Sequence, residues 1–181
     1  MDKFIMWLRR KHPGAIVRVR DFVMAYLSEF GVVGVCAALS AKITRANGRV
    51  EDLGIVSTHK VTDAFVAELV DTLKSSVAAF STYKYHDSGE STTAEAATDT
   101  VLGSPCGEAR DTGTQVEGAT ANIYKSVATH TYAGSFSITE HGLFNDPTAG
   151  TLMDRSVFTA INVESSDRIE WTYQLTCVSG G

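Results

Sequence analysis

The chain has 181 residues, 44% hydrophobic and 20% charged, which is enough for one sizeable domain with its own core and an ordinary globular composition. The formal net charge of −5 is unevenly distributed. Residues 1–20 carry six basic side chains and one acidic, whereas the rest of the chain carries 10 basic and 20 acidic. This asymmetry predicts that the first segment meets an anionic surface (a nucleic acid, a membrane or an acidic partner), with a solvated basic helix face as the alternative.

The cysteine pattern excludes two common kinds of site. Cys36, Cys106 and Cys177 are far apart, odd in number and without a CxxC pair, so neither a zinc ribbon nor a thioredoxin-like site is indicated. We expect reduced, structural thiols, which fits assembly in a cytoplasm. Cys177 lies in an alternating pattern and is predicted to point inward as a small hydrophobe.

The N-terminal 35 residues are predicted to form a basic, amphipathic helical arm. One short helix is expected over residues 2–11, ended by Pro13-Gly14, and a second over residues 16–30. The second carries an apolar stripe at helical spacing: Val19, Phe22, Val23, Tyr26, Leu27 and Phe30. The apolar run over residues 22–41 is not expected to span a membrane, because Glu29 would lie near its middle. The short run over residues 4–8 does not have the form of a signal peptide.

From residue 35 the pattern becomes extended. An alternation of apolar and polar residues precedes Asn47-Gly48, and an extended, β-branched run follows it. This pattern predicts a β-hairpin whose two turn residues both take positive φ. Thr62 and Asp63 then predict the start of a helix over about residues 62–75. Its buried face is expected to cover a sheet and to consist of Phe65, Val66, Leu69, Val70 and Leu73.

The second half of the chain is rich in strand signals. Residues 87–122 are dominated by small and polar side chains, which indicates long polar loops with short strands. Strands are then expected over residues 125–139, 156–163 and 168–178, separated by turns at 145–147 and 165–167. The sequence therefore predicts a mainly β chain: an antiparallel sandwich or jelly-roll-like domain over residues 36–181, preceded by the helical arm over residues 1–35.

The sequence offers little that indicates chemistry. None of the five histidines (12, 59, 86, 130 and 141) forms an HExxH pair. His86-Asp87-Ser88 holds the residue types of a hydrolase triad, but consecutive residues do not converge as a triad requires. Glu140-His141 is interpreted as a turn-facing polar pair. Four carboxylates could together bind a calcium ion, but the regular spacing of a calcium-binding loop is absent: Asp99, Glu108, Asp111 and Glu117. We therefore predict no catalytic, cofactor-binding or metal-ligating residue, no cofactor, and no enzyme.

Several segments resemble virion structural proteins of tailed bacteriophages. They are Tyr85-His86-Asp87-Ser88-Gly89, Thr92-Thr93-Ala94-Glu95-Ala96-Ala97-Thr98-Asp99-Thr100 and, further on, residues 138–144, 150–158, 160–163 and 171–176. The resemblance covers residue 37 to the C-terminus and points to small head-decoration (cement) or tail-accessory subunits.

The resemblance implies a capsid decoration protein, made in the host cytoplasm and located on the capsid surface. It would lay its polar loops across neighbouring copies of the major capsid protein and would associate with itself, as a homotrimer at pseudo-threefold positions. Its basic arm would anchor to an acidic patch, with no specific nucleic acid and no membrane as partner. The alternatives are a tail fibre, baseplate or head–tail connector component, and a carbohydrate-binding β-sandwich. A hydrolase using His86 or Glu140-His141 ranks last.

Overall fold

The computed structural model describes residues 18, 23, 26, 34–58, 60–73 and 80–178. Arg18, Val23 and Tyr26 are helical, as predicted for residues 16–30. The predicted helix over residues 2–11 lies outside the described residues. Within the described part of the chain, no helix is long and apolar enough to cross a membrane. The apolar run over residues 22–41 is not one continuous helix, since residues 34–41 belong to a strand.

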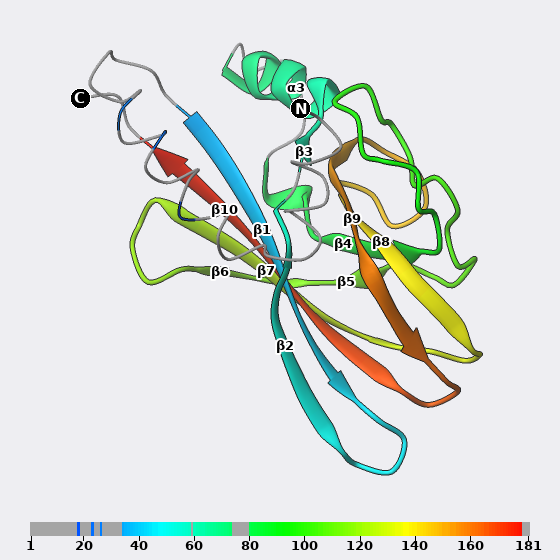
Figure 1. Ribbon diagram of the computed structural model, residues 1–181. Helices are drawn as coiled ribbons and strands as arrows, with labels where there is room; N and C mark the ends of the chain where they lie inside the picture. The colour runs from blue at the N-terminus through cyan, green and yellow to red at the C-terminus, as the bar shows by residue number, and fades with distance from the viewer. Residues whose placement is uncertain are drawn as a thin grey trace.

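Two five-stranded antiparallel sheets form a sandwich (Figure 1), which confirms the predicted fold class. The first sheet has the order β2 (Val50–Ser57), β1 (Gly34–Thr44), β10 (Arg168–Val178), β7 (Ile123–Thr131) and β6 (Thr114–Glu117). The second has the order β3 (Lys60–Val61), β9 (Leu152–Val163), β8 (Phe136–Phe144), β4 (Tyr85–Gly89) and β5 (Asp111–Thr112). Helix α3 (Asp63–Leu73) and the short 3₁₀ helix η1 (Phe80–Thr82) lie at one end of the sandwich.

Strand β10 shows how the sequence builds the core. Its bounds match the prediction, and its alternate side chains Ile169, Trp171, Tyr173 and Leu175 are buried between the sheets. The core has two main clusters. One surrounds Trp171, Leu39 and Ile138 in the body of the sandwich, and the other surrounds Tyr83, Tyr173 and Phe65 beneath α3. Cys177, next to the last residue of the same strand, is exposed, so its predicted burial is wrong. All three cysteines are free thiols.

The β1–β2 hairpin is confirmed, but its turn differs from the prediction. Gly48 has a φ of +85°, whereas Asn47 is not among the residues with positive φ. The amide of Gly48 donates to the carbonyl of Arg45, and the amide of Arg45 donates to the carbonyl of Arg49, both at 2.8 Å. This is a three-residue loop in which only the last position requires a left-handed conformation.

Helix α3 begins as predicted, but fewer of its apolar side chains are buried than predicted. Thr62 caps it, because the amide of Phe65 donates to the Thr62 hydroxyl at 3.2 Å. Phe65 is buried, but Val66, Val70 and Leu73 are 50%, 52% and 79% exposed. The expected burial of these three side chains is therefore wrong. The helix lies at the end of the sandwich and contacts it through one narrow edge, so the other apolar side chains remain uncovered.

The prediction of a single strand over residues 125–139 is also wrong. The chain turns after Tyr132, and the segment divides into β7 in one sheet and β8 in the other. Ala133-Gly134 provides the break, while Tyr132 and Phe136 still pack against the same cluster from either side of the turn. The strand expected over residues 156–163 is longer at its start, and it pairs with β8 along most of its length.

Candidate functional site

The most distinctive feature is the long connection between β4 and β5, here called the anchored loop (residues 90–110). It has no regular secondary structure beyond one bridge between Gly89 and Pro105, and it runs beside β8 and β9 on the second sheet (Figure 1). Leu102 packs there with Phe144 and Leu152 in a third small apolar cluster. Its course outside the sandwich core matches the prediction of a long polar loop.

A buried carboxylate holds this loop in place. One oxygen of Glu140 accepts hydrogen bonds from the backbone amides of Ser104 at 2.7 Å and Ser91 at 3.3 Å. The other accepts from the amide of Gly103 at 3.0 Å. A single side chain on β8 therefore joins the start of the anchored loop to residues 103–104 further along it.

Arg155 on β9 completes the attachment. Its guanidinium donates to Glu140 at 2.7 Å, to the Asp99 carboxylate at 3.0 Å and to the carbonyl of Thr93 at 3.2 Å. Desolvation would lower the pKa of Arg155, but its hydrogen bonds with Glu140 and Asp99 raise it, so the side chain remains charged. The loop is thus fixed by a paired, hydrogen-bonded charge network inside the protein.

A second cation fixes the far end of the loop. Arg110 lies over the ring of Phe144 at 3.4 Å, donates to the Asp87 carboxylate at 3.2 Å and donates to two backbone carbonyls of the 145–151 turn. Burial raises the pKa of Asp87, against the opposing effect of the Arg110 charge. The Cys106 thiol nearby has its pKa raised to about 12 by burial and by the charge of Glu90, so it is a poor nucleophile at neutral pH.

The His86-Asp87-Ser88 sequence does not form a relay. His86 and Ser88 are buried, with His86 bonded to Ser126 at 2.8 Å and Ser88 to the Tyr132 hydroxyl at 3.1 Å. Asp87 instead binds Arg110. The three side chains therefore have three separate sets of partners.

Glu140-His141 is not a turn-facing pair, and that interpretation is wrong. Both residues are buried within β8 and have separate environments. Glu140 holds the anchored loop, while His141 lies 3.0 Å from the ring of His86 and packs against Trp171. The sequence singled out these two residues without indicating that Arg155 is the partner of Glu140.

The four carboxylates considered as calcium ligands also have different partners and do not form one site. Asp99 binds Arg155, Glu108 and Asp111 bind the two ring nitrogens of His130, and Glu117 is exposed on β6. Among residues 34–58, 60–73 and 80–178, no group of three or more His, Cys, Asp or Glu side chains is arranged to hold a metal ion.

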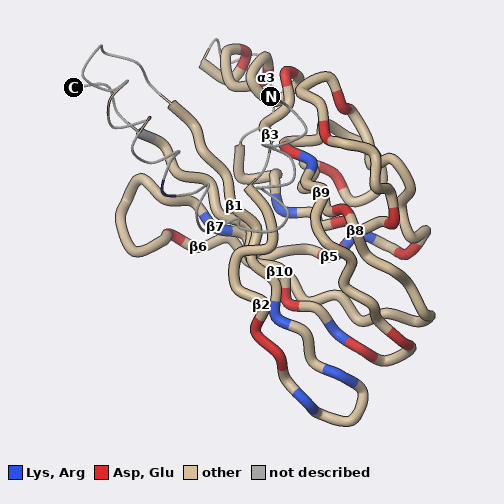
Figure 2. Tube along the Cα trace, viewed as in Figure 1, with Lys and Arg blue, Asp and Glu red and all other residues tan. Residues whose placement is uncertain are grey.

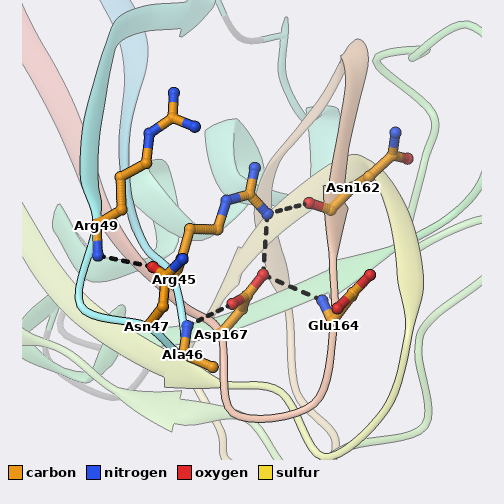
Figure 3. Close-up of a pocket in the computed structure, with 7 residues that line it drawn as sticks. All are labelled: Arg45, Ala46, Asn47, Arg49, Asn162, Glu164 and Asp167. Atoms are coloured by element: carbon orange, nitrogen blue, oxygen red, sulfur yellow. Dashed lines mark hydrogen bonds and ion pairs between the residues drawn. The ribbon is translucent and has the colours of Figure 1, made fainter.

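A polar hollow of about 540 Å³ is lined by residues of two turns (Figure 3). These turns lie at the end of the sandwich opposite α3 (Figure 1). The hollow is formed where the β1–β2 turn meets the β9–β10 turn. Asp167 joins the two turns, since it accepts from the Arg45 guanidinium at 2.9 Å and from the amides of Ala46 and Glu164 at 2.8 and 3.1 Å. Desolvation would raise the pKa of Asp167, but these bonds lower it. Arg45 and Asp167 pair here and join the two turns, so this hollow contains a structural junction.

An apolar groove of about 400 Å³ lies at the α3 end. Phe65 and Leu69 of α3, Phe80, Val35 of β1, and Leu175 and Cys177 of β10 are among its lining residues. The exposed side chains Val66, Val70 and Leu73 belong to the same helix. This end of the sandwich therefore combines an apolar groove with an uncovered apolar helix surface, whereas the opposite end is polar.

No protein-family model matches the chain, and no curated protein or solved structure matches it significantly.

Proposed function

We propose that this chain is a structural subunit of a tailed-bacteriophage virion, acting as a decoration protein that binds the capsid surface and stabilises it through contacts between subunits. The single observation that supports this best is the attachment of the anchored loop by Glu140. A loop that is fixed before binding loses little conformational entropy when it meets a partner. The ion pairs of buried Arg155 with Glu140 and Asp99 hold the anchored loop in a fixed conformation that is ready for binding.

The surface of the anchored loop suits contact with another protein. Val101 projects from it with 64% of its side chain exposed, and Leu102 beside it is buried as the anchor. Glu90 is exposed and Glu95 is half-buried on the loop, and Figure 2 shows acidic residues along this side of the molecule. The proposed capsid contact is therefore a neutral or basic surface that accepts a small apolar side chain.

The tail component and the carbohydrate-binding module remain the competing proposals. A sugar site normally presents exposed aromatic rings for stacking. Within the sandwich, residues 34–58, 60–73 and 80–178, every aromatic side chain is buried or only partly exposed, so the sandwich gives the carbohydrate alternative no support. Of the described aromatic residues, Tyr26 of the N-terminal segment is exposed. Copy number separates a decoration protein from a tail component.

The test is quantitative mass spectrometry of purified virus particles, comparing this chain with the major capsid protein. We expect one copy per capsid subunit or a simple large fraction of that number. A count of about a dozen or fewer per particle would assign the chain to the tail or portal, an estimate that follows from the small symmetric rings formed there. Absence from particles would overturn the virion proposal altogether.

A pair of matched variants tests the loop as the contact surface. Val101→Asp is expected to reduce incorporation into particles while leaving the unfolding midpoint unchanged, because the side chain is exposed. Val50→Asp is the control, since Val50 is 54% exposed on β2, away from the anchored loop. Equal incorporation of the two variants would remove the loop from the proposed interface.

A further inference from the structure

We propose that the buried histidine pair His86–His141 makes the contact between the two sheets sensitive to acid: the pair stabilises the sandwich while both imidazoles are neutral, and proton uptake destabilises it. The inference concerns the fold and does not depend on the virion function. It rests on three observations: a chain of hydrogen bonds that crosses the core, the complete burial of both rings, and the tight packing around them.

The chain of hydrogen bonds links three strands. Nδ1 of His86 on β4 lies 3.0 Å from Nε2 of His141 on β8, and Nε2 of His86 lies 2.8 Å from the Ser126 hydroxyl on β7. Because β4 and β8 belong to the second sheet and β7 to the first, the contact between His86 and Ser126 joins the two sheets. His86 is 2% exposed, and His141 and Ser126 are both 0% exposed.

Neutral rings satisfy this chain in either direction. If His86 donates through Nδ1 to His141, its Nε2 accepts from the Ser126 hydroxyl; if His141 donates to Nδ1, the Nε2 of His86 donates to Ser126. Each contact therefore holds one hydrogen between its two heavy atoms. If both rings were protonated, two N–H groups would point at each other across 3.0 Å. The pair cannot accept both protons without separating.

A first added proton is already costly, because the surroundings are closely packed. His141 packs against the indole of Trp171, with 5.0 Å between the ring centroids. A side chain at position 113, where Gly113 stands, would collide with the Ser126 hydroxyl and with Nε2 of His86, so this side of the contact leaves no space for a water molecule. An imidazolium at this place would lose its hydration, which disfavours the charged form.

The charged and titratable groups on the neighbouring strands have other partners. They are Asp87 with Arg110, Glu140 with Arg155, Asp111 and Glu108 with His130, Tyr132 with Ser88, and Asp154 beside the hydroxyl of Tyr173.

Asp154 defines the competing model. It is buried on β9, two residues from Ser156, which is the cross-strand neighbour of His141. Side chains two residues apart on a strand share a face, so Asp154 and Ser156 both lie on the face of His141. An ionised Asp154 that paired with a protonated His141 would give the opposite pH dependence. The direction of the pH dependence is therefore the decisive observation.

The expected direction follows from proton linkage. Imidazoles of the unfolded chain take up protons around pH 6.5, whereas the buried pair resists them. Because the unfolded state then binds more protons than the folded state, the free energy of unfolding falls as the pH drops below about 6.5. Each proton taken up on unfolding changes the unfolding equilibrium constant by about tenfold per pH unit.

The test compares the full-length chain with the double variant His86→Gln, His141→Gln by urea denaturation between about pH 7.5 and about pH 5, the range around the ordinary imidazole value. We expect the unfolding equilibrium constant of the native chain to rise relative to that of the double variant by about tenfold per pH unit in the acid part of this range. His130 is present in both chains, so its contribution cancels. Ser126→Ala is the matched control: it removes the bond between the sheets but no imidazole, so it is expected to be less stable at every pH and to keep the native pH dependence. Parallel curves for the native chain and the double variant, or a native chain that gains stability on acidification, would overturn the proposal.

A measurement on the native chain decides the matter if the double variant does not fold. Nitrogen-15 spectra of the imidazoles report the protonation of each ring, with His141 identified by its contact with Trp171 and His86 by its contact with His141. We expect each of the two rings to keep a single N–H at every pH at which the chain is folded. A doubly protonated His86 or His141 in the folded chain would contradict the inference.

Discussion

The guanidinium of Arg155 meets the carboxylate of Glu140 at 2.7 Å across neighbouring strands, and the side chains are 3% and 0% exposed. A buried pair of this kind is costly to break, because the remaining charge has no water to solvate it. In this protein the pair also serves a second purpose, since Glu140 binds three backbone amides of the anchored loop. The stability of the sheet and the position of the loop are therefore coupled through one carboxylate.

Replacing Glu140 by Gln tests this coupling. The substitution removes the charge opposite Arg155 and places amide hydrogens where the carboxylate accepts bonds, so we expect destabilisation by about 3–5 kcal/mol. Urea denaturation measures the loss, and hydrogen exchange at the Gly103 and Ser104 amides should accelerate. Glu117→Gln on exposed β6 is the matched control, expected to stay within about 0.5 kcal/mol. Equal midpoints for the two variants would show that the network does not stabilise the fold.

Gly89 is the position at which the loop passes closest to the sheet. A Cβ atom there would clash with the carbonyl oxygen of Ser104 and with Oε1 of Glu140, and neither can move freely because they bond the loop. Gly89→Ala is therefore expected to cost about 1–3 kcal/mol, as other overpacked sites do. Thermal unfolding measures it. Gly134→Ala is the control, since its added carbon would meet only the Phe136 ring at 3.4 Å. A similar melting temperature for both would contradict the tight approach.

Helix α3 gives a prediction that separates its buried edge from its exposed face. Phe65 packs edge-on against Tyr83 at 5.2 Å and lies 5.8 Å from Phe80, so Phe65→Ala is expected to cost about 3–5 kcal/mol. Val66→Ala, one residue further on, is expected to change the stability of the dilute monomer by no more than about 0.5 kcal/mol. Chemical denaturation at low protein concentration measures both. A large loss for Val66→Ala would mean that the sequence-based prediction of a wider buried face was right.

The sequence predicted correctly those strands that have one face in the core and the other face in contact with solvent. β10 has one wet face and one buried face, so strict alternation over residues 168–178 reveals both its bounds and its core side chains. In β8 every residue from Ile138 to Phe144 is buried, because the anchored loop covers the face turned away from the core. The alternation disappears there, so the pattern does not reveal that β7 and β8 are separate strands in different sheets.

The anchored loop could not be derived from local pattern for a similar reason. Asp99 and Arg155 are separated by 56 residues, and Glu140 and Arg155 face each other only because β8 and β9 pair. The available signal was chemical: Glu140 and Arg155 are charged residues inside segments that otherwise consist of strand-forming side chains. Such residues imply partners, but their identity requires the pairing of the strands.

His130 provides the last prediction, which concerns pH. Burial lowers the pKa of its imidazole, but hydrogen bonds and charges from Asp111 and Glu108 outweigh this and raise it above the ordinary 6.5. Because the folded pKa is higher than the unfolded one, the protonated ring stabilises the fold. That contribution is complete below the unfolded pKa and is lost as pH rises through the folded value. The free energy of unfolding should therefore decrease above about pH 6.5. Subtracting the curve of His130→Asn, measured by denaturation at a series of pH values, isolates this contribution. Asp111→Asn removes one of the two carboxylates that raise the pKa of His130, so the pH range over which this stability is lost should become narrower. Parallel pH curves for the native chain and His130→Asn would show that His130, Asp111 and Glu108 do not act as a charged cluster.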